Sequence, residues 1–208
     1  MKAPSQNTNQ KLLARIAIEP EYQRKVESPF QLIEFQNERQ STIESIGQQA
    51  KDKATKIDSV VFEGFPQHQS QQPAPYYLWA ELALTKHLIQ SMIFAEIASI
   101  QSLSTARQRI PMLAVTNSIS RLTPFVAEIE MACAADQLSK LLLMLPNQSE
   151  EISEQLGVAY PPNKPSLFVD QILVRKDSRE QPNHVSVWMK VLGFILAKPN
   201  LVSDRQED

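Results

Sequence analysis

The residue pair whose types and spacing come nearest to nucleophilic catalysis is His87 and Ser91. They lie four positions apart in an apolar stretch with helical periodicity, so both side chains fall on one face of a helix. A histidine at that spacing can activate a hydroxyl group, but a complete site also needs an orienting carboxylate and an oxyanion hole. The chain has no Gly-x-Ser-x-Gly turn. We therefore predict that His87 is a partly buried helix residue or an interface group, and that the protein is not an enzyme.

The sequence contains no recognisable ligand set for a metal ion or a cofactor. His68 and His184 have no Cys, His, Asp or Glu at a metal-ligand spacing. On the helix expected around Glu128 and Glu130, these side chains diverge by roughly 200° and share neither a proton nor a metal ion. Glycine-rich phosphate loops are missing. Cys133, the lone cysteine, is expected to be a small core residue in a reducing compartment. We predict no cofactor and no metal.

The basic residues suggest a second kind of chemistry, which is contact with nucleic-acid phosphates. Residues 164–198 contain six basic and three acidic side chains, and a few Lys or Arg side chains give salt-dependent, sequence-independent binding to RNA or DNA. Three further arginines lie near expected helix junctions. The predicted nucleic-acid-binding set is Arg107, Arg109, Arg121, Arg175, Lys176 and Arg179. The alternative is that these residues are solvated surface charges without a ligand.

An aromatic cluster is the third candidate site. Tyr76, Tyr77 and Trp79 stand together at the start of the most apolar region of the chain. Aromatic side chains are enriched at protein interfaces, where they supply much of the binding energy. We predict a protein-interaction site here, with packing inside the chain's own core as the alternative.

The elements that position these residues are expected to be helices. No glycine occurs between Gly64 and Gly157, and the region is rich in apolar residues, which is typical of long helices packed on one another. We predict helices from about Tyr76 to Leu103, over 105–122, and from Thr123 to Leu145. Tight turns would join them into an antiparallel bundle. The predicted fold class is therefore mainly α.

The rest of the chain is divided around this bundle. The predicted regions are an N-terminal helical arm (1–57), a linker (58–75), the core helical bundle (76–157) and a C-terminal appendage (158–208). In the appendage, residues 167–174 and 185–196 are rich in β-branched and aromatic residues. They fit either a β-hairpin or two short helices, and periodicity does not decide between these. The helical character of the other regions slightly favours helices.

Composition limits the class of protein and its location. The apolar fraction of 42% is too high for wholesale disorder, and the net charge of −2 is unlike that of a strongly basic coat protein. The first residues lack the apolar segment of a secretory signal. No uncharged apolar run reaches the ~18 residues that a membrane helix needs. We predict a cytoplasmic protein without membrane contact.

These observations lead to a hypothesis of a non-catalytic helical subunit in a larger assembly. Other protein subunits are the predicted partners. A nucleoprotein complex is one version, in which the chain contacts the nucleic-acid backbone, as does the small subunit of an RNA-guided effector complex; this likeness is one of architecture only. Two alternatives are a helical bundle that binds or converts a small molecule, and a free-standing dimeric helical regulator.

Overall fold

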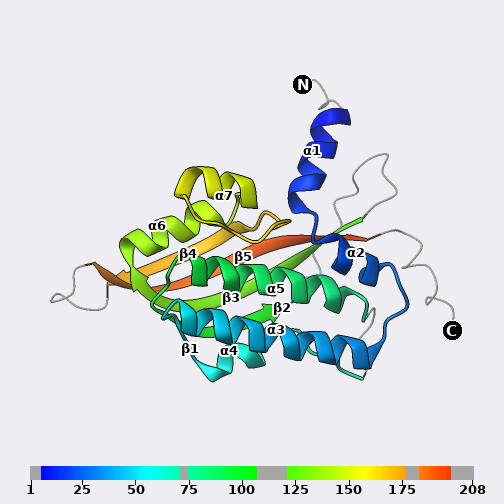
Figure 1. The fold of residues 1–208 in the computed structure, drawn as a ribbon, viewed down its shortest axis with the longest axis horizontal. Helices are drawn as coiled ribbons and strands as arrows, with labels where there is room; N and C mark the ends of the chain where they lie inside the picture. Colours follow the sequence, from blue (N-terminus) through cyan, green and yellow to red (C-terminus); the bar gives the residue numbers. More distant parts are fainter. Residues whose placement is uncertain (1–5, 71–74, 107–120, 177–182, 198–208) are drawn as a thin grey trace.

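The computed structural model shows a mixed α/β fold built on one five-stranded sheet (Figure 1). It describes residues 6–70, 75–106, 121–176 and 183–197. Helices and strands alternate irregularly along the chain. The helices are α1 (Gln6–Ile16), α2 (Pro20–Val26), α3 (Leu32–Asp52), α4 (Ser59–Glu63), α5 (Tyr77–Phe94), α6 (Ala135–Met144) and α7 (Ser149–Leu156).

The sheet has the strand order β1-β2-β3-β5-β4. Its strands are β1 (Lys56–Ile57), β2 (Ser99–Ala106), β3 (Arg121–Ala134), β4 (Phe168–Lys176) and β5 (His184–Ala197). The short β1 runs parallel to β2, and all other neighbours are antiparallel. The long strands β3 and β5 pair over their full length, from Arg121 opposite Ala197 to Ala134 opposite His184. Strands β1 and β4 are the two edges of the sheet.

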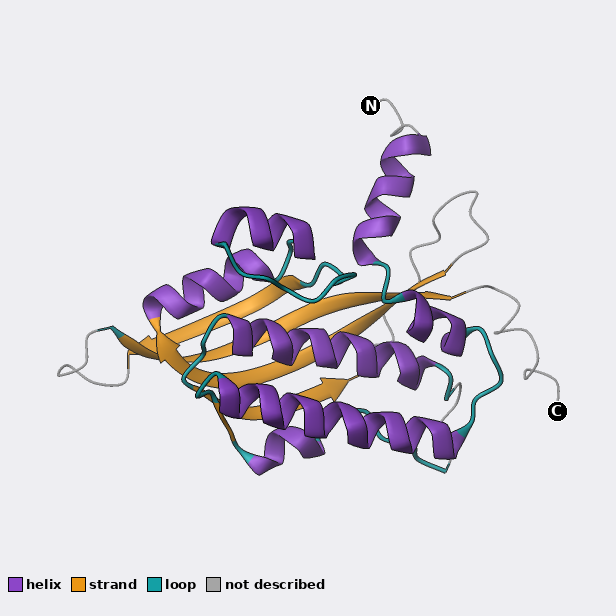
Figure 2. Cartoon of the chain, in the orientation of Figure 1, coloured by secondary structure: helices purple, strands orange, loops and turns teal. Residues whose placement is uncertain are grey.

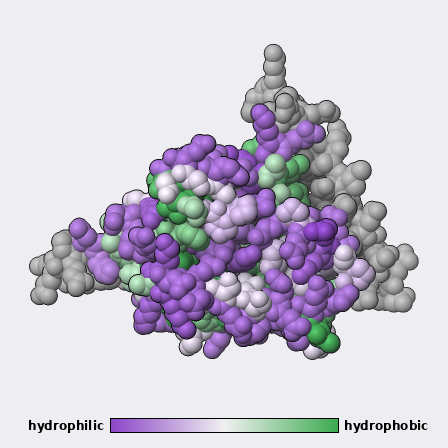
Figure 3. All heavy atoms as spheres, viewed as in Figure 1, coloured by the Kyte–Doolittle hydropathy of each residue, from purple (hydrophilic) through white to green (hydrophobic). Residues whose placement is uncertain are grey.

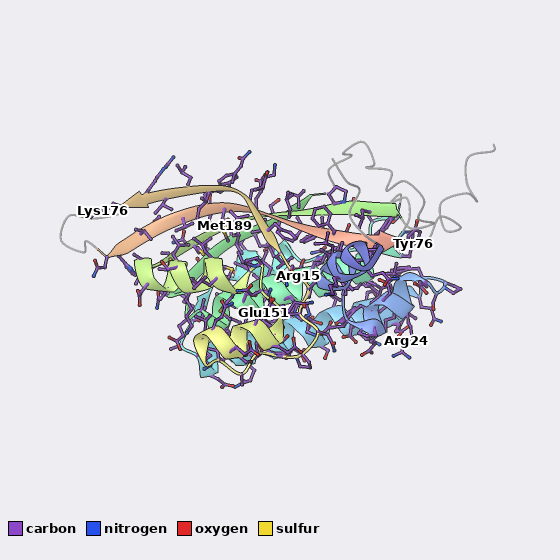
Figure 4. All side chains as sticks on the ribbon, turned by 90° about the horizontal axis from the view of Figure 1, so that it is seen from above. Arg15, Arg24, Tyr76, Glu151, Lys176 and Met189 are labelled. Carbon is purple, nitrogen blue, oxygen red and sulfur yellow. The ribbon has the colours of Figure 1, made fainter. Side chains whose placement is uncertain are left out.

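The helices and the sheet form two layers. Figure 2 shows α3 and α5 side by side in front of the strands, and Figure 4 shows β4 and β5 above a layer of helices. The central helix α5 is buried along almost its whole length, from Leu78 to Ile93. A helix that is apolar on nearly all sides needs neighbours all round. α5 finds them in α2, α3 and α6 and in strands β3 and β5.

The predicted mainly-α antiparallel bundle is wrong. The segment predicted as a helix from Thr123 to Leu145 is strand β3 followed by α6. The residues of β3 that belong to the hydrophobic core alternate along the strand: Phe125, Ala127, Ile129, Met131 and Cys133, with Val126 the one further buried residue between them. This period of two is that of a strand with one face on the core. The alternation was missed because small and apolar residues also fill several outward positions, which made the segment look uniformly apolar.

The expected helix from Tyr76 to Leu103 is also too long. It ends at Phe94 because Glu96 adopts the left-handed conformation, with φ of 62°. The backbone N–H groups of Glu96 and Ile97 donate to the carbonyls of Ile93 and Met92 (3.0 Å each), as in a Schellman motif. Glycine is the usual residue at this position. The chain uses glutamate instead, so the absence of glycine hid the end of the helix.

In the C-terminal region the hairpin interpretation is confirmed and the favoured helical one is wrong. β4 and β5 pair antiparallel, with Phe168 opposite Leu192 and Lys176 opposite Val185. A bulge between Val169 and Gln171 interrupts the register. The strands belong to the main sheet, since β5 also pairs with β3. One hydrophobic core includes residues from Ile18 to Ile195, so the N-terminal and C-terminal regions pack on the same core as the central one.

Candidate functional site

The structure does not join His87 and Ser91 into a nucleophile–base pair. The Ser91 hydroxyl donates to the backbone carbonyl of His87 (2.8 Å) and also lies 3.1 Å from the Tyr160 hydroxyl. Hydrogen bonds from serine to the carbonyl four residues earlier are common within helices. The imidazole points elsewhere, toward Glu19, with Nε2 and Oε1 3.4 Å apart. Ser91 therefore lacks the contact that would activate it.

His87 belongs to a buried polar cluster that fastens α2 to α5. Lys86 donates to Glu19 at 3.1 Å, and His87 is fully buried beside the same carboxylate. Burial lowers the pKa of His87, against the opposing effect of Glu19. Burial alone would raise the pKa of Glu19, but its contacts with His87 and Lys86 outweigh that effect and lower it. We interpret the cluster as a structural one, with a neutral His87 and an ionised Glu19 at neutral pH.

Lys164 is a second buried charge that the sequence did not single out. Its side chain is 1% exposed, and Nζ donates to the carbonyls of Leu145 (2.8 Å), Asn147 (3.0 Å) and Pro165 (3.2 Å). Burial lowers the pKa of Lys164 to about 7, although Glu151 favours the charged form. The three acceptors explain its role: the amine ties the turn after α6 to the segment that leads into β4. In the printed sequence nothing distinguishes it from a surface lysine.

The paired carboxylates share a face, contrary to the expectation from a helix. Glu128 and Glu130 lie on strand β3, where alternate residues point to the same side. Both are exposed on the face away from the helices, and Ser102 donates to Glu130 at 3.1 Å. Within the described ranges, no group of three or more His, Cys, Asp or Glu side chains is placed to hold a metal ion.

The structure does not gather the predicted nucleic-acid residues into one patch. Arg107, Arg109 and Arg179 lie outside the described residues. Arg121 is the first residue of β3. Arg175 of β4 lies at the other end of the sheet, because its partner in β5, Ser186, pairs with Ala132 near the end of β3. The eleven positions from 121 to 132 span about 35 Å of strand. Arg175 and Lys176 are exposed at the end of β4. The described part of the set therefore gives no support to a nucleic-acid-binding surface.

The aromatic cluster is split between the core and the rim of the helical layer. Trp79 is 1% exposed and packs against Phe35 at 5.2 Å between ring centroids, edge to face. Lys25 Nζ lies 4.3 Å from the Trp79 ring centroid, in a cation–π arrangement. Tyr76 and Tyr77 are partly buried and contact each other at 4.5 Å. Trp79 therefore packs within the chain itself, and the two tyrosines are the accessible part of the cluster.

A hollow of about 540 Å³ lies between α4, α5 and strands β2 and β3. Gly64, Phe65, Leu103 and Phe125 line it, together with acidic side chains such as Glu63. It is open to solvent and its lining is largely polar, unlike the enclosed and mainly apolar clefts that bury small ligands. We assign it no ligand.

The most unusual exposed feature is the outer edge of β4, which we call the β4 edge and define as Gln171–Arg175. Its three central residues, Ile172, Leu173 and Val174, are 41%, 46% and 46% exposed. Such β-branched and aliphatic residues are normally covered in a sheet. Because β4 is the last strand of the sheet, its outward N–H and C=O groups have no neighbouring strand among the described residues. A long apolar edge of this kind is a template for another strand.

The uncovered face of the sheet adjoins the β4 edge. In β5 the residues Val187, Met189 and Val191 are buried toward the helices, while Trp188, Leu192 and others between them point to the opposite side and are partly exposed. Figure 4 shows side chains projecting from this side of β4 and β5, where no described helix lies over them. The apolar surface therefore continues from the edge onto the neighbouring strand.

The helix-covered side is largely hydrophilic. Figure 3 shows a mainly polar surface on this side, with a hydrophobic patch over α6 and smaller ones elsewhere. Leu142 and Leu143 of α6 are 36% and 48% exposed. Figures 1 and 4 place α6 against the same end of the sheet as β4. Among the described residues, β4 and α6 carry six of the ten exposed large hydrophobic residues, and the other four, including Ile33 at 74%, lie on α1, α3 and α4.

Sequence reasoning missed the β4 edge although the signal was present. The segment from Phe168 to Lys176 was recognised as a candidate strand, but its place in the sheet depends on a partner, β5, and on the strand order. An edge position is decided by which strands pair. A run of Ile, Leu and Val alone predicts a buried strand, and here it forms an exposed one.

Comparison with known proteins identifies the fold and no more. No protein-family model matches the sequence, and no curated protein is detectably similar to it. Three solved structures from Akkermansia muciniphila are similar in fold at 18% identity each. The first, a crystal structure, covers 94% of this chain and 90% of its own, with a TM-score of 0.61. The second, a structure without its transmembrane region, covers 95% and 99% with a TM-score of 0.61.

The third is the crystal structure of a core domain, and it covers 93% of this chain and all of its own with a TM-score of 0.62. Such near-complete coverage shows that the α/β arrangement is a shared fold. At this level of identity it does not extend to function. In the present chain, none of the described helices is both long enough and apolar enough to cross a membrane.

Proposed function

We propose that the protein is a non-catalytic subunit of a larger protein assembly and that it docks to a neighbouring protein chain through the β4 edge. The observation that carries this proposal is the exposure of Ile172, Leu173 and Val174 on an edge strand that has no neighbour on its outer side among the described residues. Folded proteins usually protect such edges with charges, proline or a covering element. An edge left apolar at its centre is suited to receive a strand from a partner.

The surroundings of the β4 edge support a protein partner. Strand addition provides main-chain hydrogen bonds, and pockets or flat apolar surfaces beside the strand provide specificity. Trp188 and Leu192 on the adjoining face offer such a surface. Arg175 and Lys176 at one end and Asp170 at the other give the edge charges of opposite sign, which can fix the direction of an incoming strand.

The test is site-specific photo-crosslinking in the native cell. A photo-reactive amino acid at position 173 should cross-link to protein, and the cross-linked peptide should be identified by mass spectrometry. The matched control is position 60, where Val60 is 45% exposed on α4. Cross-links that form at 173 and not at 60, and that survive nuclease treatment, support the proposal. No cross-link at position 173, or a cross-link yield there equal to that at position 60, would overturn the proposal.

A further inference from the structure

The sequence of the β4 edge is complementary to itself, which points to a second copy of this chain as the partner. We infer that two copies pair their β4 strands antiparallel about a two-fold axis at Leu173, joining two sheets into one continuous sheet. This inference rests on the proposed function, because it names the occupant of the same edge.

The geometry of a two-fold axis restricts the register. When two identical antiparallel strands pair about an axis perpendicular to the sheet, the residue on the axis faces its own copy. With the axis at Leu173, Ile172 lies opposite Val174 of the copy, and Gln171 lies opposite Arg175 of the copy. Directly opposite residues in antiparallel strands have their side chains in contact, on the same face of the sheet.

In this register every pair is compatible. Ile172 and Val174 both lie on the face that carries the helices, since they are opposite the buried residues Met189 and Val187 of β5. Leu173 lies on the uncovered face, opposite Trp188. Apolar residues therefore meet apolar residues on both faces. The amide of Gln171 meets the guanidinium of Arg175, and no like charges are opposed.

Moving the two-fold axis by one residue in either direction gives less favourable side-chain pairs. An axis at Ile172 would place Asp170 opposite Val174 and Val169 opposite Arg175. An axis at Val174 would place Leu173 opposite Arg175 and Ile172 opposite Lys176. Each of these pairs buries an apolar group against a charge. The bulge between Val169 and Gln171 also ends regular pairing on that side.

The charges near the edge are arranged so that they do not oppose the pairing. Asp170 is engaged within its own chain, 3.1 Å from Lys190 of β5. Lys176 is exposed at the end of β4 and lies beyond the paired residues. A two-fold pairing uses the β4 edge of both copies, so it closes as a dimer.

The test places charged residues at the two-fold axis. Dimerisation is measured by analytical ultracentrifugation over a range of protein concentrations. The unmodified chain should form a concentration-dependent dimer. Leu173→Lys and Leu173→Glu each place two like charges opposite one another, and each should weaken the dimer by at least about tenfold. An equimolar mixture of the two variants should recover it, because opposite charges then meet.

The control is Val60→Lys, a similarly exposed apolar residue on α4, which should leave the dimer unchanged. Circular dichroism should show that all variants are folded. A second readout is Leu173→Cys, which should form a disulfide-linked dimer under oxidised glutathione. The two Cα atoms at position 173 would lie within the distance that a disulfide spans. The native thiol of Cys133 is buried and does not compete.

Each outcome has a distinct meaning. A monomer at all concentrations, or a dimer unaffected by both charge variants, overturns the self-pairing. If both single variants weaken the dimer and the mixture does not recover it, the axis at Leu173 is overturned. If self-pairing fails while photo-crosslinks from position 173 identify a different protein, the proposed function stands without this inference. If position 173 gives no cross-link in cells and the purified chain is monomeric, both are overturned.

Discussion

The two edges of the sheet differ in how far other parts of the chain cover them. At one edge, β1 consists of two residues only, and the chain around it covers what remains of β2. Thr105 of β2 donates to the carbonyl of Gly64 at 3.1 Å, and a Cβ at Gly64 would overlap the Leu103 carbonyl oxygen. α4 and the residues after it are thus pressed directly against the strand. At the other edge, none of the described elements covers the nine residues of β4 in this way.

The difference teaches that exposure at β4 is specific to that edge. The same chain closes its first edge with a short strand, a helix and buried residues such as Val61 and Phe65. Edge protection is the usual arrangement in soluble proteins. An edge left open and apolar in the same sheet is therefore best explained by a partner, and the predictions below test this contrast.

The largest effect is expected at the closed edge. Phe65→Ala should lower the free energy of unfolding by about 3–5 kcal/mol, because a fully buried ring leaves a cavity that the surroundings fill only in part. The matched control is Phe168→Ala at the start of β4, where the ring is 39% exposed, with an expected loss of about 1 kcal/mol or less. Urea unfolding at a concentration that keeps the chain monomeric measures both. Equal losses in free energy of unfolding for Phe65→Ala and Phe168→Ala would contradict the difference between the two edges of the sheet.

An intermediate effect is expected where the helical layer meets the start of β4. Lys164→Met preserves the aliphatic length but removes the donor from three carbonyls. Leaving buried acceptors without a donor should cost about 1–3 kcal/mol. Lys140→Met is the control, because Lys140 forms only a loose ion pair with Glu96 at 3.7 Å, with an expected change within about 1 kcal/mol. Thermal unfolding followed by circular dichroism distinguishes the two.

The pH dependence of the same residue sharpens this test. The pKa of Lys164 is about 7 in the folded chain, against an ordinary value of 10.5. Between these values the unfolded chain holds the extra proton, so the stability contributed by this group rises from pH 7 toward pH 10.5. The slope is at most about 1.4 kcal/mol per pH unit. Lys164→Met should lack this rise. If the difference in free energy of unfolding between the two proteins does not change with pH, the three carbonyls keep the ammonium group of Lys164 at its ordinary pKa.

The smallest effect on stability is expected at the open edge. Leu173→Thr should change the free energy of unfolding of the monomer by no more than about 0.5 kcal/mol, because the side chain is already half exposed and threonine suits a strand. Val60→Thr serves as the control for exposure. A loss as large as that of Phe65→Ala would mean that β4 is packed within its own chain. Small stability changes with weakened dimerisation would support a docking role.

Some of the fold was predictable from particular residues. The apolar residues of α5 lie on nearly all sides of a helix, and this segment is indeed the buried central helix. Gly157 adopts a left-handed φ of 65° at the end of α7, as glycine commonly does after the last helical residue. In both cases the local signal and the tertiary environment agree. Residues 167–174 and 185–196 fitted either strands or short helices, with helices slightly favoured, and they form strands β4 and β5.

Other elements were unpredictable for a physical reason. The ends of α3 and α5 lie at Ala54 and Glu96, which adopt φ of 56° and 62° without the glycine that usually marks such positions. The backbone of Ile97 is held by its bond to Met92, and packing of the flanking residues maintains the conformation. The inference from missing glycines to uninterrupted helices between Gly64 and Gly157 therefore failed at Glu96.

The sequence by itself determined a substantial apolar core and the central helix, because these follow from local composition and periodicity. It left the C-terminal segments open between strands and helices. It did not determine which strands pair or which face is covered. Those features depend on contacts between residues far apart in the chain, such as Glu130 opposite Trp188. The tertiary structure alone decided that Phe65 is sealed at one edge and that Leu173 is exposed at the other, because burial is a property of the assembled layers.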